Sequence, residues 1–314
     1  MGISKKNLVK ISCLLVFLLV PGVVFSQTSD TGGEPKLGSI FYFPKAGSGD
    51  VNLLLNYTTT NSKSTGTVNS ETATNTAGIT FDTSHSFTDF FAITAILPVG
   101  FYSSVASDSK TTTENSVEMG SPSFGFNWRI LNGANNGLYL DLVFNYTLGY
   151  SKDNGFTGAD LIGASILIGK ESKNFAYGLE FGGIYFLETE KQLGTIAYIQ
   201  ESIIGYAIEP SVQWFLNESL DLKVGAIIAI VNPIEGSGTT SGAKFTVASD
   251  TVVSTGLAAE LGFQVVPNRT RINIGLLYGL PYDSQLVLTY SGTPYTTDTT
   301  SSLLFARVSA NFTY

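Results

Sequence analysis

The last twelve residues of the chain, 303–314, alternate between two kinds of side chain, and they constrain the fold more than any other stretch. One set is apolar: Leu304, Ala306, Val308, Ala310, Phe312 and Tyr314. Successive side chains of a strand point to opposite faces, so this pattern predicts a strand with one apolar and one mostly polar face. Such a strand at an open edge would aggregate, and the first strand of a closed sheet is its natural partner. A β-sandwich strand that happens to end the chain is the alternative.

The chain begins with the pattern of a secretory signal peptide. Lys5, Lys6 and Lys10 precede a short apolar run, Ile11–Val20, and small residues follow up to Ser26. A basic start, a short apolar core and a small residue at the cut site are typical of a cleaved leader and not of a spanning helix. We therefore expect a signal peptide at 1–26, an irregular N-terminal segment at 27–50 and the folded domain at 51–314.

Charge and cysteine content exclude several classes of function. The chain has 17 lysines and arginines against 25 aspartates and glutamates, and without the three leader lysines the balance is 14 to 25, a net charge of −11. An acidic chain without a basic cluster is not expected to bind nucleic acid. The single cysteine, Cys13, lies in the leader, so we expect neither a disulfide nor a thiolate metal site in the mature chain.

Hydrophobic residues make up 43% of the chain, yet after the leader no apolar run approaches the ~20 residues of a membrane helix. Alternating stretches follow one another instead from Val51 onward, and the clearest is 138–150. This stretch exceeds the ~9–11 residues that a tilted strand needs to cross the hydrocarbon core. The chain is therefore either a large soluble β-protein or a membrane barrel.

The connections between the alternating stretches differ regularly in length. Short ones are expected at 87–90, 131–137, 170–174, 215–220 and 266–271, and longer polar loops at 61–75, 105–116, 152–158, 189–197, 233–245 and 282–300. Short turns on one side and long loops on the other are typical of outer-membrane barrels, in which the short side is periplasmic. A sandwich requires neither this asymmetry nor an even number of strands. The sequence predicts an all-β protein: one transmembrane antiparallel up-and-down β-barrel of about twelve strands, with both termini periplasmic.

The polar face of the predicted strands carries charges of both signs. The candidates for a layer inside the lumen are Arg129, Asp141, Glu180, Glu209, Lys223, Glu260, Arg271 and Arg307, with Asp221 on the same face. We expect Arg129, Arg271 and Arg307 to approach one layer with the glutamates. Such a layer is either a structural plug of ion pairs or a constriction that selects solutes. Many glycines share this face, which indicates either a need for room inside or curvature of the strands.

Enzymatic chemistry has little support in the sequence. The sole histidine, His85, precedes Ser86 near a predicted short turn, which is the wrong end for chemistry on the outer leaflet. No second histidine is present for a metal pair, and no glycine loop leads from a strand into a helix. We assign no catalytic, cofactor-binding or metal-binding residue and expect no cofactor.

Two features resemble known outer-membrane proteins. The terminal residues Phe312 and Tyr314 resemble the C-terminal signal that the outer-membrane assembly machinery reads. Ile93–Gly100 followed by Gly120–Ile130 resembles the early strands of the meta-pathway phenol-degradation (MetA-type) transporter family, although Pro122-Ser123 stand where that family has Gly-Asp. The resemblance implies a channel for small, often hydrophobic or aromatic compounds, without catalytic residues.

The sequence is compatible with three functions. The first is passive uptake of small solutes through a channel in the bacterial outer membrane, where lipids and the assembly machinery are the other partners. The second is a closed structural barrel whose surface loops act in adhesion. The third is an outer-membrane hydrolase that uses His85.

Overall fold

The wall of the protein is a closed antiparallel β-sheet in a computed structural model that describes residues 28–29, 37, 39–66, 69–107, 110–114, 117–133, 137–149, 159–193, 196–240 and 243–314. The expected leader, 1–26, and the expected loop at 152–158 lie outside these residues. No helix in the described part of the chain is long and apolar enough to cross a membrane.

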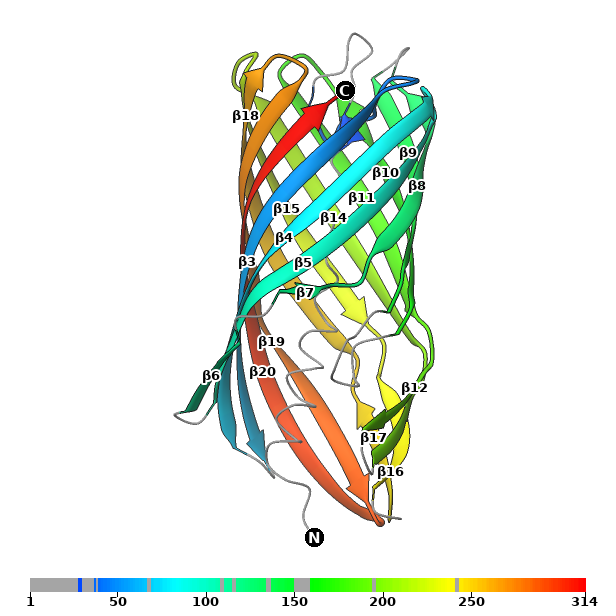
Figure 1. Ribbon diagram of the computed structural model, residues 1–314, viewed down its shortest axis with the longest axis vertical. Coiled ribbons are helices and arrows are strands. Elements are labelled where there is room, and N and C mark those ends of the chain that lie inside the picture. The colour runs from blue at the N-terminus through cyan, green and yellow to red at the C-terminus, as the bar shows by residue number, and fades with distance from the viewer. Residues whose placement is uncertain are drawn as a thin grey trace.

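Twelve long strands form the barrel, as the sequence predicts (Figure 1). They are β3 (Gly49–Gly66), β4 (Ser70–Thr88), β5 (Phe91–Ser107), β8 (Ser123–Asn132), β9 (Leu138–Thr147), β10 (Leu161–Glu171), β11 (Phe175–Phe186), β14 (Ile203–Phe215), β15 (Leu220–Val231), β18 (Val252–Val266), β19 (Thr270–Tyr290) and β20 (Thr293–Thr313). Short strands extend them: β6 (Lys110–Glu114), β7 (Glu118–Met119), β12 (Thr189–Leu193), β13 (Ile196–Gln200), β16 (Glu235–Thr240) and β17 (Ala243–Ser249).

The sheet closes between its first and last long strands. β20 pairs with β3 in antiparallel register from Thr297 opposite Gly66 to Thr313 opposite Asp50. The backbone of Tyr314 adds the last rung, because its N–H donates to Gly49 O at 3.0 Å and its carbonyl accepts from Gly49 N–H at 3.2 Å. Closure therefore leaves no edge of the sheet exposed between β20 and β3.

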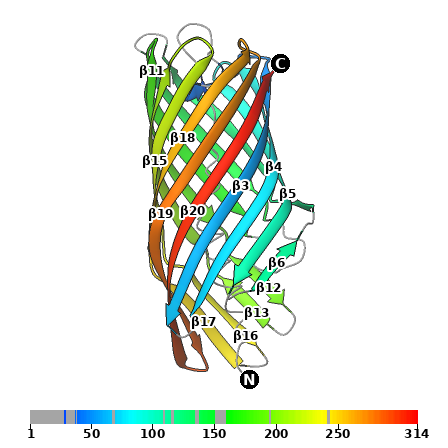
Figure 2. The same cartoon turned by 90° about the vertical axis from the view of Figure 1, so that its left-hand side faces the viewer.

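The two ends of the barrel differ. The C-terminus and the turn between β18 and β19 lie at the upper end in Figure 1, which we call the turn end, and the β16–β17 and β19–β20 hairpins lie at the lower end (Figures 1 and 2). We call the lower end the far end. There the paired strands β19 and β20 extend well beyond the complete ring of strands that lies nearer the turns (Figure 2).

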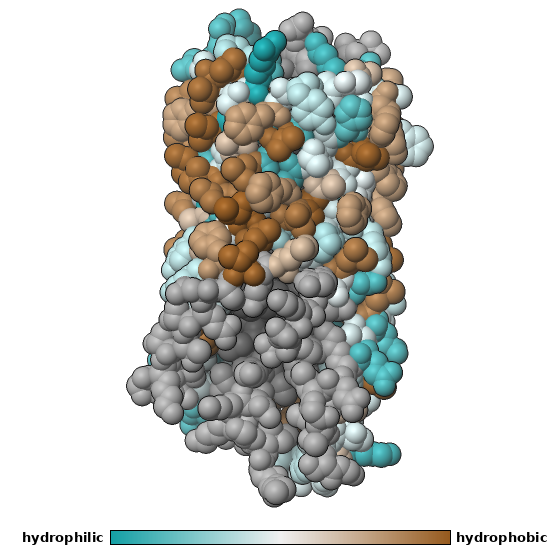
Figure 3. Space-filling model, viewed as in Figure 1, coloured by the Kyte–Doolittle hydropathy of each residue, from teal (hydrophilic) through white to brown (hydrophobic). Residues whose placement is uncertain are grey.

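The outward face of the turn-end half is apolar. On β19, Ile272, Ile274, Leu276, Tyr278 and Leu280 are all exposed, and Figure 3 shows such side chains as a brown belt in the half nearer the turns. The stretch from Ile272 to Leu280 matches the ~9–11 residues that a tilted strand needs to cross a bilayer. The belt has the length and character of a lipid-facing surface.

The polar stretches expected to be loops are largely strands, and that part of the sequence interpretation is wrong. Instead of ending before the loop expected at 61–75, β3 runs to Gly66, and β19 and β20 fill most of 282–300. Inward hydroxyls pair across the seam, since Ser62 Oγ lies 3.0 Å from Ser301 Oγ and Ser64 Oγ lies 3.0 Å from Thr299 Oγ1. Threonine-rich segments favour pleated structure, and the neighbouring strands offer them a continuous ladder.

A segment that precedes β3 lies inside the barrel. Its strand β2 (Phe41–Tyr42) pairs in parallel with β1 (Thr28–Ser29), and Leu37, Phe41 and Phe43 are buried. Within the segment expected to be irregular, residues 40–43 thus include a short strand and are buried inside the lumen.

Replacing Tyr314 by Asp, or deleting residues 312–314, is expected to block assembly into the outer membrane. Phe312 and Tyr314 face outward with exposed fractions of 46% and 63%, so a charge at 314 would lie on the lipid-facing rim, and the deletion removes the last rungs of the closing pair. Cell fractionation measures the outcome, with Tyr314→Phe as the control that keeps the aromatic ring. Normal outer-membrane amounts of the deletion variant would contradict the role given to the terminal strand.

Candidate functional site: the charged lumen

The eight charged residues predicted to face inward all lie on the inner face of the barrel. They alternate along their strands with exposed apolar residues, as Arg271 does with Ile272 and Arg129 with Trp128 and Ile130. This placement follows from the period of two along each strand. We expected these residues to form a single layer, but the strand register separates them into two groups.

The first group lies near the turn end and includes the pair Arg129–Asp141. These residues are register partners on β8 and β9, and Arg129 donates from Nε and Nη2 to the two carboxylate oxygens of Asp141, each at 2.9 Å. Both side chains are buried. A bidentate geometry of this kind holds a buried arginine in one orientation.

Arg271 and Asp221 form the second buried pair of this group. Arg271 Nη1 donates to Asp221 Oδ2 at 2.5 Å and Nη2 donates to Oδ1 at 2.8 Å. Gln213 Nε2 adds a bond to Asp221 at 2.7 Å, and Arg271 Nε donates to Asn273 Oδ1 at 2.5 Å. The strands β14, β15 and β19 are thereby joined across the lumen wall by one polar network.

The internal segment completes both networks. The carbonyl of Phe41 accepts from Arg129 Nη2 at 2.6 Å, the carbonyl of Leu37 accepts from Arg271 Nη1 at 3.3 Å, and Ile40 N–H donates to Gln213 Oε1 at 2.9 Å. The Phe41 ring stacks on Tyr139 with centroids 4.7 Å apart. The turn-end charges thus hold a piece of the chain inside the barrel, which corresponds to the structural-plug alternative for this group.

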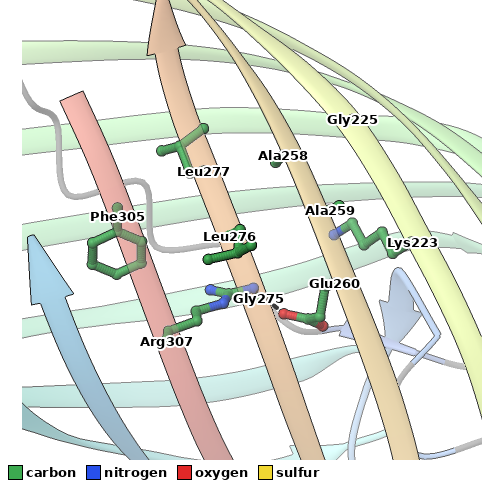
Figure 4. Close-up of a pocket in the computed structure, with 10 residues that line it drawn as sticks. All are labelled: Lys223, Gly225, Ala258, Ala259, Glu260, Gly275, Leu276, Leu277, Phe305 and Arg307. Carbon is green, nitrogen blue, oxygen red and sulfur yellow. Dashed lines mark hydrogen bonds and ion pairs between the residues drawn. The ribbon is translucent and has the colours of Figure 1, made fainter. Parts of the chain in front are cut away.

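The second group lies farther from the turns and follows one register row across four strands. Lys223 on β15 is opposite Glu260 on β18, Glu260 is opposite Gly275 on β19, and Gly275 is opposite Arg307 on β20. Arg307 reaches across Gly275 and donates from Nη2 to Glu260 Oε2 (Figure 4). On β19 the row lies four residues beyond Arg271, so the two groups are separate tiers.

Glu180 and Glu209 belong to the far side of this second tier. They are register partners on the inner faces of β11 and β14. Both carboxylates lie within electrostatic range of Lys223, as do Glu260 and Arg307. The second tier therefore contains three carboxylates and two basic groups on the walls of the lumen.

A small hollow adjoins the row. Lys223, Glu260 and Arg307 line its charged side, and Ala258, Leu277 and Phe305 line its apolar side (Figure 4). The volume of the hollow is about 20 Å³, which is room for a water-sized group. Charged and apolar walls of the lumen meet at this hollow.

Inward glycines make room for the buried groups. A Cβ at Gly262 would lie 1.8 Å from Arg271 Nη2, and one at Gly275 would lie 3.0 Å from Arg307 Nε. A Cβ at Gly169 would lie 2.6 Å from Phe41 Cζ. At these positions the absence of a side chain leaves the room inside the barrel that the sequence pattern indicated.

The structure gives His85 no catalytic partner in Ser86. The two residues are successive on β4, so Ser86 points into the barrel, where it is buried, while the His85 ring lies 6.3 Å from Tyr314 and 5.2 Å from Phe87. Among the described residues no group of three or more His, Cys, Asp or Glu side chains could hold a metal ion.

Sequence reasoning missed the uncharged members of the lumen. Gln213, Asn273 and Tyr139 are almost completely buried on inner faces, and each contacts an arginine or its carboxylate. Their strand phase would have placed them inside. Their partners depend on which strands become neighbours, which the phase does not indicate.

No protein-family model and no curated protein matches the chain. Among solved structures, an outer membrane channel from Pseudomonas putida F1 superposes with a TM-score of 0.55 at 14% identity, over 84% of this chain and 96% of that one. The likeness is one of fold, and it groups this barrel with outer-membrane proteins of Gram-negative bacteria by architecture.

Two further structures align with lower scores. The toluene transporter TodX of P. putida has a TM-score of 0.40 at 13% identity, over 85% of this chain and 90% of its own. The outer membrane protease OmpT of Escherichia coli has a TM-score of 0.37 at 10% identity, over 85% and 97%.

Gly262→Ala is expected to destabilise the barrel, because the new methyl group would displace Arg271 from its buried pair with Asp221. Breaking such a pair costs roughly 3–5 kcal/mol. Gly163→Ala is the matched control, since its Cβ would have no heavy atom nearer than 3.9 Å. Denaturant unfolding of the refolded proteins in lipid vesicles measures both, and equal stabilities would contradict the packing role of Gly262.

Proposed function

We propose that this protein is a channel that takes up small solutes passively across the bacterial outer membrane. One observation carries the proposal: the outer face of the barrel is apolar and its inner face is charged. A soluble barrel buries its apolar residues, whereas a membrane barrel turns them toward lipid and keeps polar groups in the lumen. The charged second tier is the part of the lumen suited to select solutes.

The short turns and both ends of the mature chain are assigned to the periplasm. This orientation rests on the general rule that outer-membrane barrels have short periplasmic turns and longer external extensions. It requires a leader at 1–26 that is cleaved after secretion across the inner membrane. Lipids of the outer membrane and its assembly machinery are then the partners of the apolar belt and of the terminal strand.

Hydrophobic or aromatic compounds are the proposed class of solute. The likeness of Ile93–Gly100 and Gly120–Ile130 to the MetA-type transporters supports this class. The inner surface supports it as well, because Ile203, Val231, Ile234 and Val252 form a buried apolar cluster on the inner wall. A solute of this class would meet apolar side chains before it reaches the charged row.

One observation favours the closed barrel as a second candidate. The segment at 37–43 is bound by both turn-end arginines, and a lumen that remained blocked there would leave only the far-end strands to act at the cell surface. Permeation measurements distinguish these two functions.

Replacing Glu209 and Glu260 by Gln is expected to shift the ion preference of the refolded protein toward anions without preventing folding. Two carboxylates leave the second tier while Lys223 and Arg307 remain, so the field in the lumen becomes more positive. The reversal potential across a planar bilayer in a salt gradient measures the preference. Glu218→Gln removes a carboxylate from an exposed turn and is the control.

The two candidate functions give different results in this experiment. Conductance with no change in reversal potential would show that the second tier does not line the path. The absence of conductance from correctly folded protein, before and after substitution, would overturn the channel and leave the closed barrel.

A further inference from the structure

Two carboxylates on the inner wall belong to neither charged tier. Asp50 on β3 and Asp82 on β4 come from paired strands that run side by side in Figure 2. Their chain neighbours Val51 and Phe81 are exposed on the outer face, so the period of two turns both carboxylates toward the lumen. None of the ion pairs that the described residues form includes either carboxylate.

The strand register gathers further oxygen-bearing side chains around Asp50. Ser84 lies directly opposite and donates from Oγ to Asp50 Oδ2 at 3.0 Å. Asn52 lies opposite Asp82 in the adjoining inward row, and Ser86 follows Ser84 on the same face of β4. Opposite side chains have Cβ atoms roughly 4.5–5.5 Å apart, and diagonal ones roughly 7–8 Å. We call these five residues the oxygen patch.

Two oxygens of the patch have no hydrogen-bond partner among the described residues. They are Asn52 Oδ1 and Ser86 Oγ, and both atoms are buried. The whole Ser86 residue is buried, with an exposed fraction of 0%. Buried polar atoms are almost always paired, so each of these oxygens indicates a group that the polypeptide itself does not supply.

The patch has the composition of a site for a hard cation. Its two carboxylates give it a formal charge of −2, and its remaining side chains are hydroxyls and one amide. Arg271 belongs to the same register row as Asn52, two strands away, but it is already paired with Asp221. Ca²⁺ takes about six to eight oxygen ligands at about 2.3–2.6 Å in a flexible geometry, whereas Mg²⁺ demands a nearly ideal octahedron. A patch on one face of a sheet suits Ca²⁺ better.

We propose that the oxygen patch binds one Ca²⁺ ion between β3 and β4. The carboxylates of Asp50 and Asp82 supply the charge, Asn52 Oδ1 and Ser86 Oγ supply neutral ligands, and water from the lumen completes the shell. Asp50 also forms the last register pair of the closing seam, opposite Thr313. The ion therefore stabilises the wall beside the seam, whether or not the lumen conducts.

Two other occupants fit the patch less well. A water molecule would satisfy the unpaired oxygens but would leave the charges of both carboxylates uncompensated. A proton shared between Asp50 and Asp82 would remove one charge, but Asn52 Oδ1 and Ser86 Oγ would still lack a partner. A cation meets both conditions.

The test is thermal unfolding of the EDTA-treated, refolded protein in a non-ionic detergent at a pH of about 8, where free carboxyl groups are ionised. Titration with Ca²⁺ should give a Kd of about 0.1–1 mM, the range of sites with few charged ligands. At about 10 mM Ca²⁺ the midpoint should rise by about 3 °C or more, because the ion binds only the folded state. Mg²⁺ should bind about tenfold more weakly.

Four variants locate the ion. Asp50→Asn and Asp82→Asn should each weaken Ca²⁺ binding about tenfold, and in EDTA Asp82→Asn should be at least as stable as the wild type, because repulsion from Asp50 is relieved. Ser86→Ala keeps both charges and should weaken Ca²⁺ binding about threefold. Asp89→Asn removes an exposed carboxylate from the neighbouring β4–β5 turn and should leave Ca²⁺ binding unchanged.

The contrary results are equally definite. The absence of a Ca²⁺-dependent shift in the folded wild type, or equal shifts in the wild type and both Asn variants, would overturn the site. Unchanged Ca²⁺ binding by Ser86→Ala would overturn the arrangement of ligands. If Asp50→Asn fails to fold, Asp82→Asn provides the same comparison, since no described hydrogen bond depends on its carboxylate.

Discussion

The pairing of β20 with β3 is the interaction on which the rest of the structure depends. In a bilayer no water is available to satisfy a free strand edge, so the sheet is stable only as a ring in which every strand has two neighbours. The ladder from residues 297–313 to 50–66 supplies that closure, and the terminal Tyr314 extends it to Gly49. Once the ring is closed, the period of two determines which side chains face lipid and which face the lumen. The apolar belt and both charged tiers follow from this single topological condition.

Closure of the ring also explains how so many charged side chains can be buried without a large loss of folding stability. A buried arginine is stable when a carboxylate and further acceptors satisfy its donors, and the ring brings such groups together from strands far apart in sequence. Arg271 and Asp221 are 50 residues apart, yet they form a two-bond pair that Gln213, Asn273 and the carbonyl of Leu37 complete. The turn-end tier thus stabilises the barrel and retains the internal segment. The second tier contacts apolar wall instead, and for that reason we assign solute recognition to it.

Some features of this arrangement follow from the local sequence and could be predicted, whereas others depend on which strands become neighbours and in which register. The inward direction of Arg129, Glu260 and Arg307 follows from local alternation, which every strand repeats. The pairing of Glu260 with Arg307 could not be predicted, because it depends on the register of β18, β19 and β20 and on Gly275 between them. The seam at Ser64 and Thr299 was expected to be loop, since serine and threonine resemble turn residues until a neighbouring strand provides partners. The internal segment is held mainly through its backbone carbonyls. Because every residue has a backbone carbonyl, no pattern in the sequence indicates this position.

The most direct test of the account is a cross-link across the closing seam. In a Cys13→Ser background, Ser62→Cys with Ser301→Cys places two thiols where the side-chain oxygens lie 3.0 Å apart. The account predicts rapid disulfide formation in the membrane-assembled protein, seen as a shift in mobility on a non-reducing gel. The control Ser62→Cys with Thr299→Cys keeps the same face but misses the register by two residues, and it should cross-link poorly. Equal cross-linking of the two pairs, or none in either, would contradict a barrel closed by β20 and β3 in this register.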